Sequence, residues 1–460
     1  MRTESDILST IMFSQTANWN IKQFFNKNTI TSSFKLERIG KVLTRCKEKM
    51  TVEDNQVYKR ITIKTSCGGV FVRDETLGKE IKTKCQYYIK SGQLAVSKID
   101  ARNGAFGIVP PEADRAIITA NFWVYDVDCS IANIGYLTLL LSSDFFVQAW
   151  QDCSNGSGNR LYLQEQKFLN YKIPLPDISV QNQLVEKYKQ CIRESEAIDR
   201  KANSLEEEIE AYLFETLMIP TLPAQIISEK LLLKTRFKNL VGWGAKVNCN
   251  PIKPQEVFQS NHYKGANLEY FGELNPNTKY PPAINEISFI PMECVSDIYG
   301  EVTETYSGNT SDSKGYTKFK EQDILWAKIT PCMQNGKCAI AKNLKNGFGY
   351  GSTEFHVFRT NQNALPEYIY CFLRSKRLRE VAISYFTGSV GQQRVGADFL
   401  SALTIPKLPI FSDSSDVMTQ EKLVRHVFNI KRQIKELNNA ADSLRSRAKK
   451  EFGEAVFGET

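Results

Sequence analysis

Two loops of the 460-residue chain gather side chains that can donate hydrogen bonds. The donors are Lys98, Arg102 and Asn103 in KIDARNGAFG, and Lys328, Gln334, Asn335 and Lys337 in KITPCMQNGK. Arginine pairs well with guanine, asparagine and glutamine pair with adenine, and lysine pairs with phosphate. Glycines in such loops let the backbone come close to a ligand. Taken alone, each loop also has the composition of an ordinary surface turn.

A second pair of donor-bearing loops lies in a stretch that the chain contains twice. The stretches are NGSGNRLYLQEQKFLNYKIPLP (155–176) and TGSVGQQRVGADFLSALTIPKLP (387–409). Their glycines Gly156 and Gly388 are 232 positions apart, which is half the chain length plus two residues. The donors in these loops are Arg160 in the first and Gln392, Gln393 and Arg394 in the second. Duplicated donor loops on two domains would suit a target with two parts.

A long helix is predicted after each copy of this stretch. Residues 179–218 and 419–450 contain neither glycine nor proline, and apolar or small residues recur every 3.5 positions, as in a coiled-coil seam. The seam consists of Leu184, Tyr188, Cys191, Ser195, Ile198, Ala202, Leu205 and Ile209 in the first helix, and Leu423, Val427, Ile430, Ile434, Leu437, Ala441, Leu444 and Ala448 in the second. Alternatively, each helix packs only on its own domain.

The charges of the two predicted helices favour pairing between them. Residues 179–218 hold five basic and nine acidic residues, a net charge of −4, whereas residues 419–450 hold nine and three, a net charge of +6. Opposite charges disfavour self-pairing of either helix. About 200 residues separate the helices, so the connection can also bridge their far ends and antiparallel pairing is open.

The globular halves match as well. GQLAVSKI (92–99) and QDILWAKI (322–329) are predicted strands. In both halves a β-rich stretch follows and then one short helix, predicted at 136–150 and 366–386. The predicted domains are a first globular domain (1–178), a helix (179–218), a hinge with a second globular domain (219–410, the hinge at 219–235) and a second helix with a tail (411–460).

The composition argues against several kinds of site. There is no phosphate-binding P-loop, no dinucleotide fingerprint and no amino-methyltransferase motif, so we expect no catalysis by this chain. The 11 cysteines form no Cys-x-x-Cys and the three histidines lack further ligands at metal spacing, so we expect no metal. No apolar run reaches membrane-spanning length, and we expect a cytoplasmic protein. The net charge of +8 permits a polyanionic partner.

These motifs resemble the DNA-specificity subunits of bacterial type I restriction–modification systems. The resemblance rests on SKIDARNGAFGIVPPE and NFWVYDVD in the first half, and on AKITPCMQNGKCAIA, GSTEFHV and TGSVGQQRV in the second. The Ile-Pro…Leu-Pro stretch before each helix also fits. The family usually continues with Glu-Gln, where this chain has Gln181-Asn182-Gln183 and Thr419-Gln420-Glu421. Residues 1–33 and 232–285 resemble the family least, so their roles are open.

The resemblance implies a mixed α/β fold with two target-recognition domains and an antiparallel coiled coil that acts as a ruler. It implies double-stranded DNA and two modification subunits as partners. Those subunits would bring S-adenosylmethionine and N6-adenine methylation, and any restriction subunits would bring ATP and Mg. The chain itself would hold no cofactor and would read DNA with the loop residues named above. Alternatives are a specificity subunit of a type IIB or stand-alone methylation system, a coiled-coil scaffold, or an enzyme acting on DNA by itself.

Overall fold

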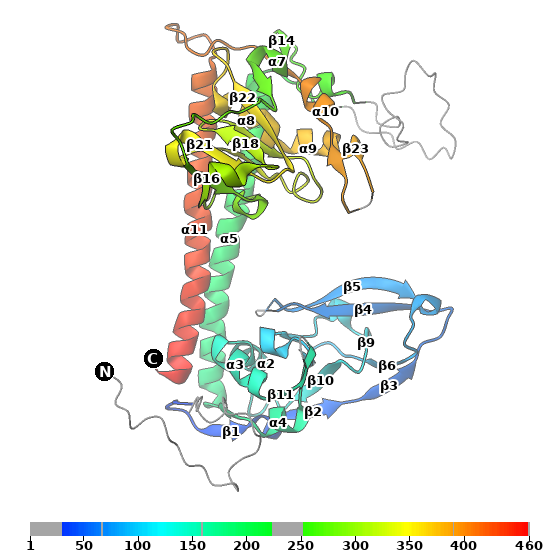
Figure 1. Cartoon of the computed structure of the whole chain (residues 1–460). Helices are drawn as coiled ribbons and strands as arrows, with labels where there is room; N and C mark the ends of the chain where they lie inside the picture. Colours follow the sequence, from blue (N-terminus) through cyan, green and yellow to red (C-terminus); the bar gives the residue numbers. More distant parts are fainter. Residues whose placement is uncertain (1–29, 66–67, 158–159, 223–251, 390, 459–460) are drawn as a thin grey trace. The chain divides into compact units, whose positions relative to one another are not determined.

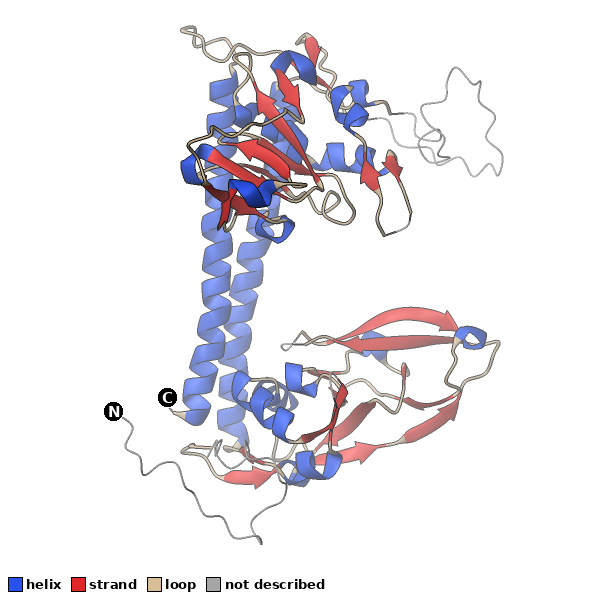
Figure 2. Cartoon of the chain, viewed as in Figure 1, coloured by secondary structure: helices blue, strands red, loops and turns tan. Residues whose placement is uncertain are grey.

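The computed structural model describes residues 30–65, 68–157, 160–222, 252–389 and 391–458. The chain divides into two compact units, each containing both sheets and helices, which confirms the predicted mixed α/β class (Figures 1 and 2). Unit 1 comprises Met1–Glu196 with Ala441–Thr460, and unit 2 comprises Ala197–Ala440. Residues 223–235 of the predicted hinge lie outside the described residues.

The centre of unit 1 is a four-stranded antiparallel sheet with helices packed on it. Its strands, in spatial order, are β2 (Leu43–Cys46), β10 (Phe122–Val127), β7 (Leu94–Ser97) and β8 (Phe106–Ile108). The helices are α2 (Ile134–Leu141), α3 (Asp144–Asp152) and α4 (Glu165–Asn170). The aromatic rings of Phe106, Trp150 and Phe168 pack together between them and are fully buried.

Unit 1 also has a second, five-stranded sheet. Its spatial order is β3 (Glu48–Thr51), β6 (Cys85–Tyr88), β9 (Ile117–Ile118), β4 (Val57–Ile63) and β5 (Val70–Leu77). Two small antiparallel ladders complete the unit: β1 (Leu36–Arg38) with β13 (Lys172–Pro174), and β11 (Ser154–Ser157) with β12 (Arg160–Leu163).

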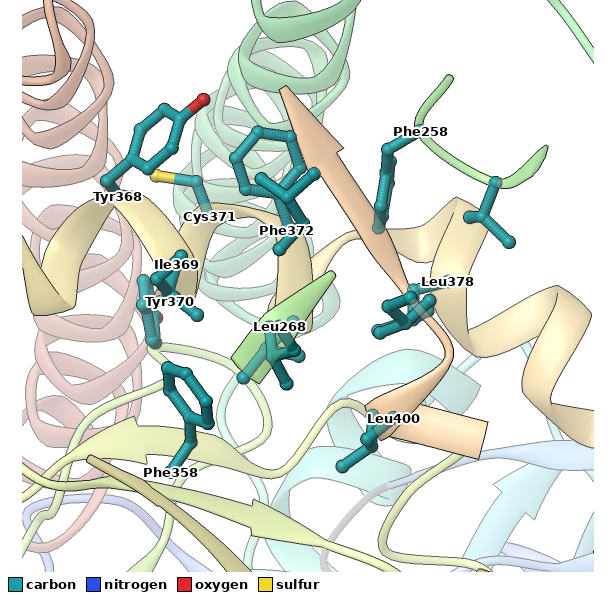
Figure 3. Packing of buried hydrophobic residues seen from close by; sticks show 14 of the residues in the cluster. Phe258, Leu268, Phe358, Tyr368, Ile369, Tyr370, Cys371, Phe372, Leu378 and Leu400 are labelled. Carbon is teal, nitrogen blue, oxygen red and sulfur yellow. The ribbon is translucent and has the colours of Figure 1, made fainter. Parts of the chain in front are cut away.

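Unit 2 repeats the central sheet of unit 1. The order is β15 (Gly272–Leu274), β22 (Phe355–Thr360), β19 (Ile324–Ala327) and β20 (Cys338–Ile340), with helices α7 (Leu268–Phe271), α8 (Pro366–Arg374), α9 (Lys376–Ile383) and α10 (Ala397–Ser401). Figure 3 shows the core between them, with Phe358 of β22, Tyr370 of α8 and Leu400 of α10.

The second sheet of unit 2 has four strands. They are β17 (Tyr306–Asn309), β16 (Glu286–Ile290), β21 (Phe348–Gly351) and β18 (Thr317–Lys320), and only β16 and β21 run parallel. The small ladders are β14 (Gly265–Asn267) with β25 (Thr404–Pro406), and β23 (Phe386–Thr387) with β24 (Arg394–Val395). The repeated stretches of sequence thus supply the last strand of equivalent ladders in the two units.

One prediction of local structure was wrong in both halves: each contains two short helices where one was predicted. In unit 2 the chain leaves the helical conformation at Ser375, which has φ −57° and ψ 144°. The Ser375 side chain then accepts a hydrogen bond from the backbone N–H of Leu378 and caps α9. In unit 1 Ser143 is extended in the same way between α2 and α3. Serine at these positions competes with helix continuation.

The two long helices pair within each unit. Helix α5 spans Ile178–Thr216 and α11 spans Gln420–Phe457. In unit 1 the first half of α5 packs on the end of α11, where the Tyr188 and Phe452 rings are 6.4 Å apart. In unit 2 the second half of α5 packs on the start of α11, where the Tyr212 and His426 rings stack at 3.8 Å. The pairing is therefore antiparallel in both units, and the residues of the 3.5-residue period are buried or half-buried.

A buried glutamine ties the start of α5 to unit 1. Gln181 is fully buried, and its side-chain amide donates hydrogen bonds to the carbonyls of Ile131 and Pro176 at 2.9 and 2.7 Å. Its Oε1 accepts from the backbone N–H of Asn133 at 2.8 Å. Both N–H groups of the amide and its oxygen are thus hydrogen-bonded within unit 1.

Gln420 ties the start of α11 to unit 2 in the same way. Its amide donates to the carbonyls of Asn363 and Leu408 at 2.8 and 2.9 Å, and its Oε1 accepts from the N–H of Leu365 at 2.9 Å. Gln420 is also fully buried and lies 239 positions after Gln181. The repeat therefore extends to individual hydrogen bonds.

The Ile-Pro pair before each helix has a buried partner as well. Tyr136 of α2 donates its hydroxyl hydrogen to the carbonyl of Pro174 at 2.9 Å, and Tyr368 of α8 does the same to Pro406 at 2.7 Å. Both tyrosines are fully buried. The repeat therefore also includes this contact between a tyrosine hydroxyl and a proline carbonyl.

Candidate nucleic-acid interface

In unit 1, Lys98 lies where the central sheet meets the β11–β12 hairpin. Its backbone N–H donates to the carbonyl of Asn121 and its carbonyl accepts from the N–H of Leu163, each at 2.9 Å. Its ammonium group donates to the carbonyl of Ala120 at 3.0 Å and lies 5.5 Å from the centre of the Trp123 ring. The Lys98 side chain is therefore already held by its neighbours.

The other predicted donors of unit 1 lie on both sides of this junction. Arg102 and Asn103 belong to the single 3₁₀ turn Ala101–Asn103, which ends at Gly104 with φ 73°. A left-handed residue of this kind favours glycine. Asn103 is exposed and Arg102 is half-buried. Arg160 begins β12, opposite Ser157.

In unit 2, Lys328 occupies the equivalent junction. Its backbone N–H donates to the carbonyl of Glu354 and its carbonyl accepts from the N–H of Val395, each at 2.9 Å. The half-buried Lys328 ammonium makes no hydrogen bond or ion pair with any residue that the structure describes. The Lys98 ammonium, by contrast, donates to the carbonyl of Ala120.

The loop after Lys328 is held by its backbone. Arg379 donates to the carbonyl of Gln334 at 2.9 Å and Arg374 donates to that of Gly336 at 2.8 Å. Gln334 and Asn335 are exposed, whereas Lys337 points inward and donates to the carbonyl of Met292 at 2.9 Å. Two exposed amide side chains thus stand on a fixed backbone, while the Lys337 ammonium supports the fold.

Arg394 is bound by the carboxylate of Glu354, which was not among the predicted site residues. Its Nε and Nη2 donate to Glu354 at 2.8 and 2.6 Å, and its Nη1 donates to the carbonyl of Gln392 at 2.9 Å. The hydrogen bonds from Arg394 hold the pKa of Glu354 below its usual value. Gln392 is exposed, and the half-buried Gln393 accepts a backbone hydrogen bond from Thr330 at 3.0 Å.

The structure thus joins the predicted loops pairwise within each unit. Backbone hydrogen bonds connect Lys98 with β12, and Lys328 with β24, through matching positions of the repeat. The supporting residues Glu354, Arg374 and Arg379 were not predicted. The basic run RSKRLRE (374–380) was visible in the sequence, but its link to the loop at 331–337 depends on the fold.

Within the ranges that the structure describes, no group of three or more His, Cys, Asp or Glu side chains is placed to hold a metal ion. No helix in the same ranges is long and apolar enough to cross a membrane.

The chain has recognisable relatives. The EcoEI specificity subunit of the type I restriction enzyme from Escherichia coli is 36% identical over 159 residues, which are 34% of this chain and 27% of that protein. The EcoAI specificity subunit, also from Escherichia coli, is 37% identical over 160 residues, with the same shares. The chain thus matches about a quarter of the length of these curated relatives.

A chain in a solved structure has a similar fold. That structure is described as the structural basis of complex assembly and conformational transition of the type I R-M system, and its chain has a TM-score of 0.50 and 15% identity. The alignment covers 93% of this chain and 98% of that one. The Methylase_S family model, described as the type I restriction modification DNA specificity domain, matches residues 31–207 and 248–439. Because this model matches most of both halves, the chain belongs to the family of type I restriction modification DNA specificity domains.

Proposed function

We propose that the chain is the DNA-specificity subunit of a type I restriction–modification complex. Unit 1 and unit 2 each read one half of a bipartite double-stranded target. The long helices hold two modification subunits, which supply S-adenosylmethionine and N6-adenine methylation. Any restriction subunits add ATP and Mg. The chain selects the site and catalyses no step.

The observation that carries this proposal is the duplicated junction at Lys98 and Lys328. Lys98 and Lys328 follow equivalent strands, β7 and β19, of the two central sheets. The carbonyl of each lysine accepts a backbone hydrogen bond from the equivalent hairpin of its own unit. The neighbouring exposed amides Asn103, Gln334 and Asn335 are suited to base edges. Two such surfaces in one chain suit two half-sites better than one active site.

Genome-wide mapping of N6-methyladenine tests the proposal. Cells with and without the chain, both retaining their modification subunits, are compared. We expect one motif to disappear with the chain, consisting of two half-sites about one helical turn apart, centre to centre. Exchanging residues 1–178 for a related domain should alter one half-site only. A contiguous motif, or methylation that does not depend on the chain, contradicts the proposal.

Each alternative function predicts a different result. A type IIB or stand-alone methylation system leaves the methylation result unchanged but needs no separate ATP-driven subunit for its activity. An enzyme acting by itself would bind labelled S-adenosylmethionine as the purified chain. A scaffold would show no steep fall of DNA binding with salt, which phosphate contacts produce.

A further inference from the structure

The two units differ most in their second sheets. The central sheets have equivalent strands in the same order, whereas the second sheets are β3-β6-β9-β4-β5 in unit 1 and β17-β16-β21-β18 in unit 2. If both units perform the same task on different DNA sequences, the shared parts support the common task. The parts that differ are then where the sequences are distinguished. This step rests on the proposed function.

A polar cavity of about 350 Å³ lies beside the second sheet of unit 2. It is formed by β18, the start of β22 and the segment that follows β15. The lining side chains that matter here are Asn275, Asn277, Tyr316, Lys318, Lys328 and His356. Lys328, a predicted contact residue, thus shares a cavity with residues of the sheet that differs between units.

Two ammonium groups that make no hydrogen bond or ion pair with a described residue line this cavity. The Lys318 ammonium lies 5.1 Å from the centre of the Tyr280 ring and has no ion pair among the described residues. Lys328 likewise has none there, because the neighbouring Glu354 carboxylate pairs with Arg394 at 2.6 Å and attracts Lys328 only at longer range. Like charges in one cavity are favourable only when an anion or water compensates them.

The wall of the cavity is fixed by hydrogen bonds. The side chain of Asn275 accepts from the backbone N–H of Val357 at 3.0 Å and contacts Nδ1 of His356 at 3.1 Å. Nε2 of His356 contacts the carbonyl of Val395 at 3.0 Å, and burial lowers the pKa of His356, which favours the neutral ring. A neutral ring with its proton on Nε2 satisfies both contacts.

Asn277 is the exception in this wall. It is exposed and its side chain makes no hydrogen bond to any residue within the described ranges. An asparagine amide offers both a donor and an acceptor, which is the pattern that pairs with adenine. A free amide beside two free ammonium groups suits a ligand with a phosphate and a base edge.

The sheet face that continues from the cavity is aromatic. Tyr306, Phe289, Tyr350 and Lys318 are directly opposite one another on the four adjacent strands. Residues paired in this way lie on one face of a sheet. Tyr306 is 44% exposed and Tyr316 at the cavity is 45% exposed. Tyr316 and Lys318, which line the same cavity, give the apolar and ionic contacts that nucleic acid accepts, whereas Tyr306 lies on the opposite edge strand.

The corresponding sheet of unit 1 has different chemistry. On β4, Arg60 is paired with Asp74 of β5 and donates to its carboxylate at 2.6 and 2.9 Å. Arg73 also donates to this carboxylate, at 2.9 Å, so two arginines share Asp74. The second sheets therefore offer different contacts, as expected of surfaces that distinguish different sequences.

We propose that the cavity of unit 2 is a DNA-contact site that helps determine the target sequence. Lys318 and Lys328 bind a backbone phosphate of one half-site. Asn277 binds the edge of a neighbouring base and determines specificity at that position. The ligand is double-stranded DNA, and a free small anion is the alternative that the test must exclude.

The test uses the full chain assembled with its modification subunits. Duplexes carry the mapped target, with each base pair of both half-sites replaced in turn. The variants are N277A, N277D (which keeps the size but removes the donors), K318Q and K328Q. The controls are K320Q, an exposed lysine of the same strand, and N285A, an exposed asparagine outside the cavity lining.

The asparagine variants should change base discrimination, whereas the lysine variants should change overall DNA affinity. N277A and N277D should lose between about 5-fold and 150-fold of discrimination at one position of one half-site. K318Q and K328Q should weaken binding to all duplexes alike and each lower the slope of log affinity against log salt by about one. The two controls should behave as the wild type in both measurements.

Three results would overturn the site. Both Asn277 variants could retain wild-type discrimination at every position, K318Q and K328Q could match K320Q, or inorganic phosphate could bind the wild type at the cavity without competing with DNA. In each case the wild type still selects a bipartite target, so the proposed function stands. If the wild type selects no target at all, the proposed function fails instead, and this inference with it.

Discussion

Removing Glu354 should show what Arg394 does. A guanidinium has five N–H donors. In the structure Arg394 uses its Nε–H and one Nη2–H on Glu354 and one Nη1–H on the carbonyl of Gln392. One N–H therefore remains on each Nη, and such a pair is what a bidentate contact to O6 and N7 of guanine requires. Glu354 would act by orienting this pair.

The expected magnitudes follow from this count. R394A loses both contacts, so discrimination at one G·C pair should fall between about 5-fold and 150-fold. E354A keeps the donors but releases the guanidinium. If E354A loses one of the two charged hydrogen bonds to guanine on average, its discrimination at that G·C pair should fall roughly tenfold. The double variant should match R394A, because a missing arginine cannot be misoriented.

Binding to duplexes with single substitutions, with thermal melting of each variant, provides the assay. Because the pKa of Glu354 is lowered in the folded chain, the pair stabilises the fold above the ordinary pKa of a glutamate, about 4.3. That contribution is lost as the pH falls through the lower folded pKa, so the melting temperatures of wild type and R394A should converge there. If R394A melts earlier but discriminates as well as the wild type at every position, Arg394 is a structural residue only.

Three other predictions concern the helices. Q420A should lower the free energy of unfolding of unit 2 by about 3 kcal/mol, because three buried hydrogen bonds are lost, and hydrogen exchange should show no such effect for Q433A, which lies exposed on the same helix. Burial lowers the pKa of Lys431 to about 8. The unfolded chain therefore binds more protons between pH 8 and about 10.4, so stability should rise with pH in that window, and urea unfolding of K431M should lack this rise. Adding one heptad to each helix, after Asn203 and after Glu436, lengthens the pair by about 10 Å. Methylation mapping should then find half-sites about three base pairs further apart with unchanged bases, since each base pair adds about 3.4 Å, and an unchanged spacing would contradict a ruler.

Periodicity predicted those elements whose pattern is local. The strand at 92–99 became β7 and the strand at 322–329 became β19, because alternation and flanking glycines are visible within ten residues. The second sheets were not predicted. Strand β9 has only two residues, Ile117 and Ile118, and joins β6 and β4 through pairings that no local pattern specifies.

The candidate site divides in the same way. Duplication identified Lys98 and Lys328 because each copy of the repeat contains a lysine at this position. The engagement of Arg394 by Glu354, 40 residues earlier, depends on how β22 and β24 meet. Asn277 lies in 232–285, the part of the sequence that resembles the family least. Its exposure beside Lys328 became visible only when the fold brought β15 and β22 together.

The buried glutamine at the start of α5 has a consequence for how such a chain can be recombined. The side-chain amide of Gln181 bonds to Ile131, Asn133 and Pro176, so this side chain belongs to the domain before it although the residue is part of the helix. A chimera joined at residue 178 separates the Gln181 side chain from the backbone groups of its own domain that bind it. A junction after Gln181 transfers the side chain together with its hydrogen-bond partners. Inheritance of a foreign half-site should therefore be tolerated best when the crossover falls inside the first turn of the helix.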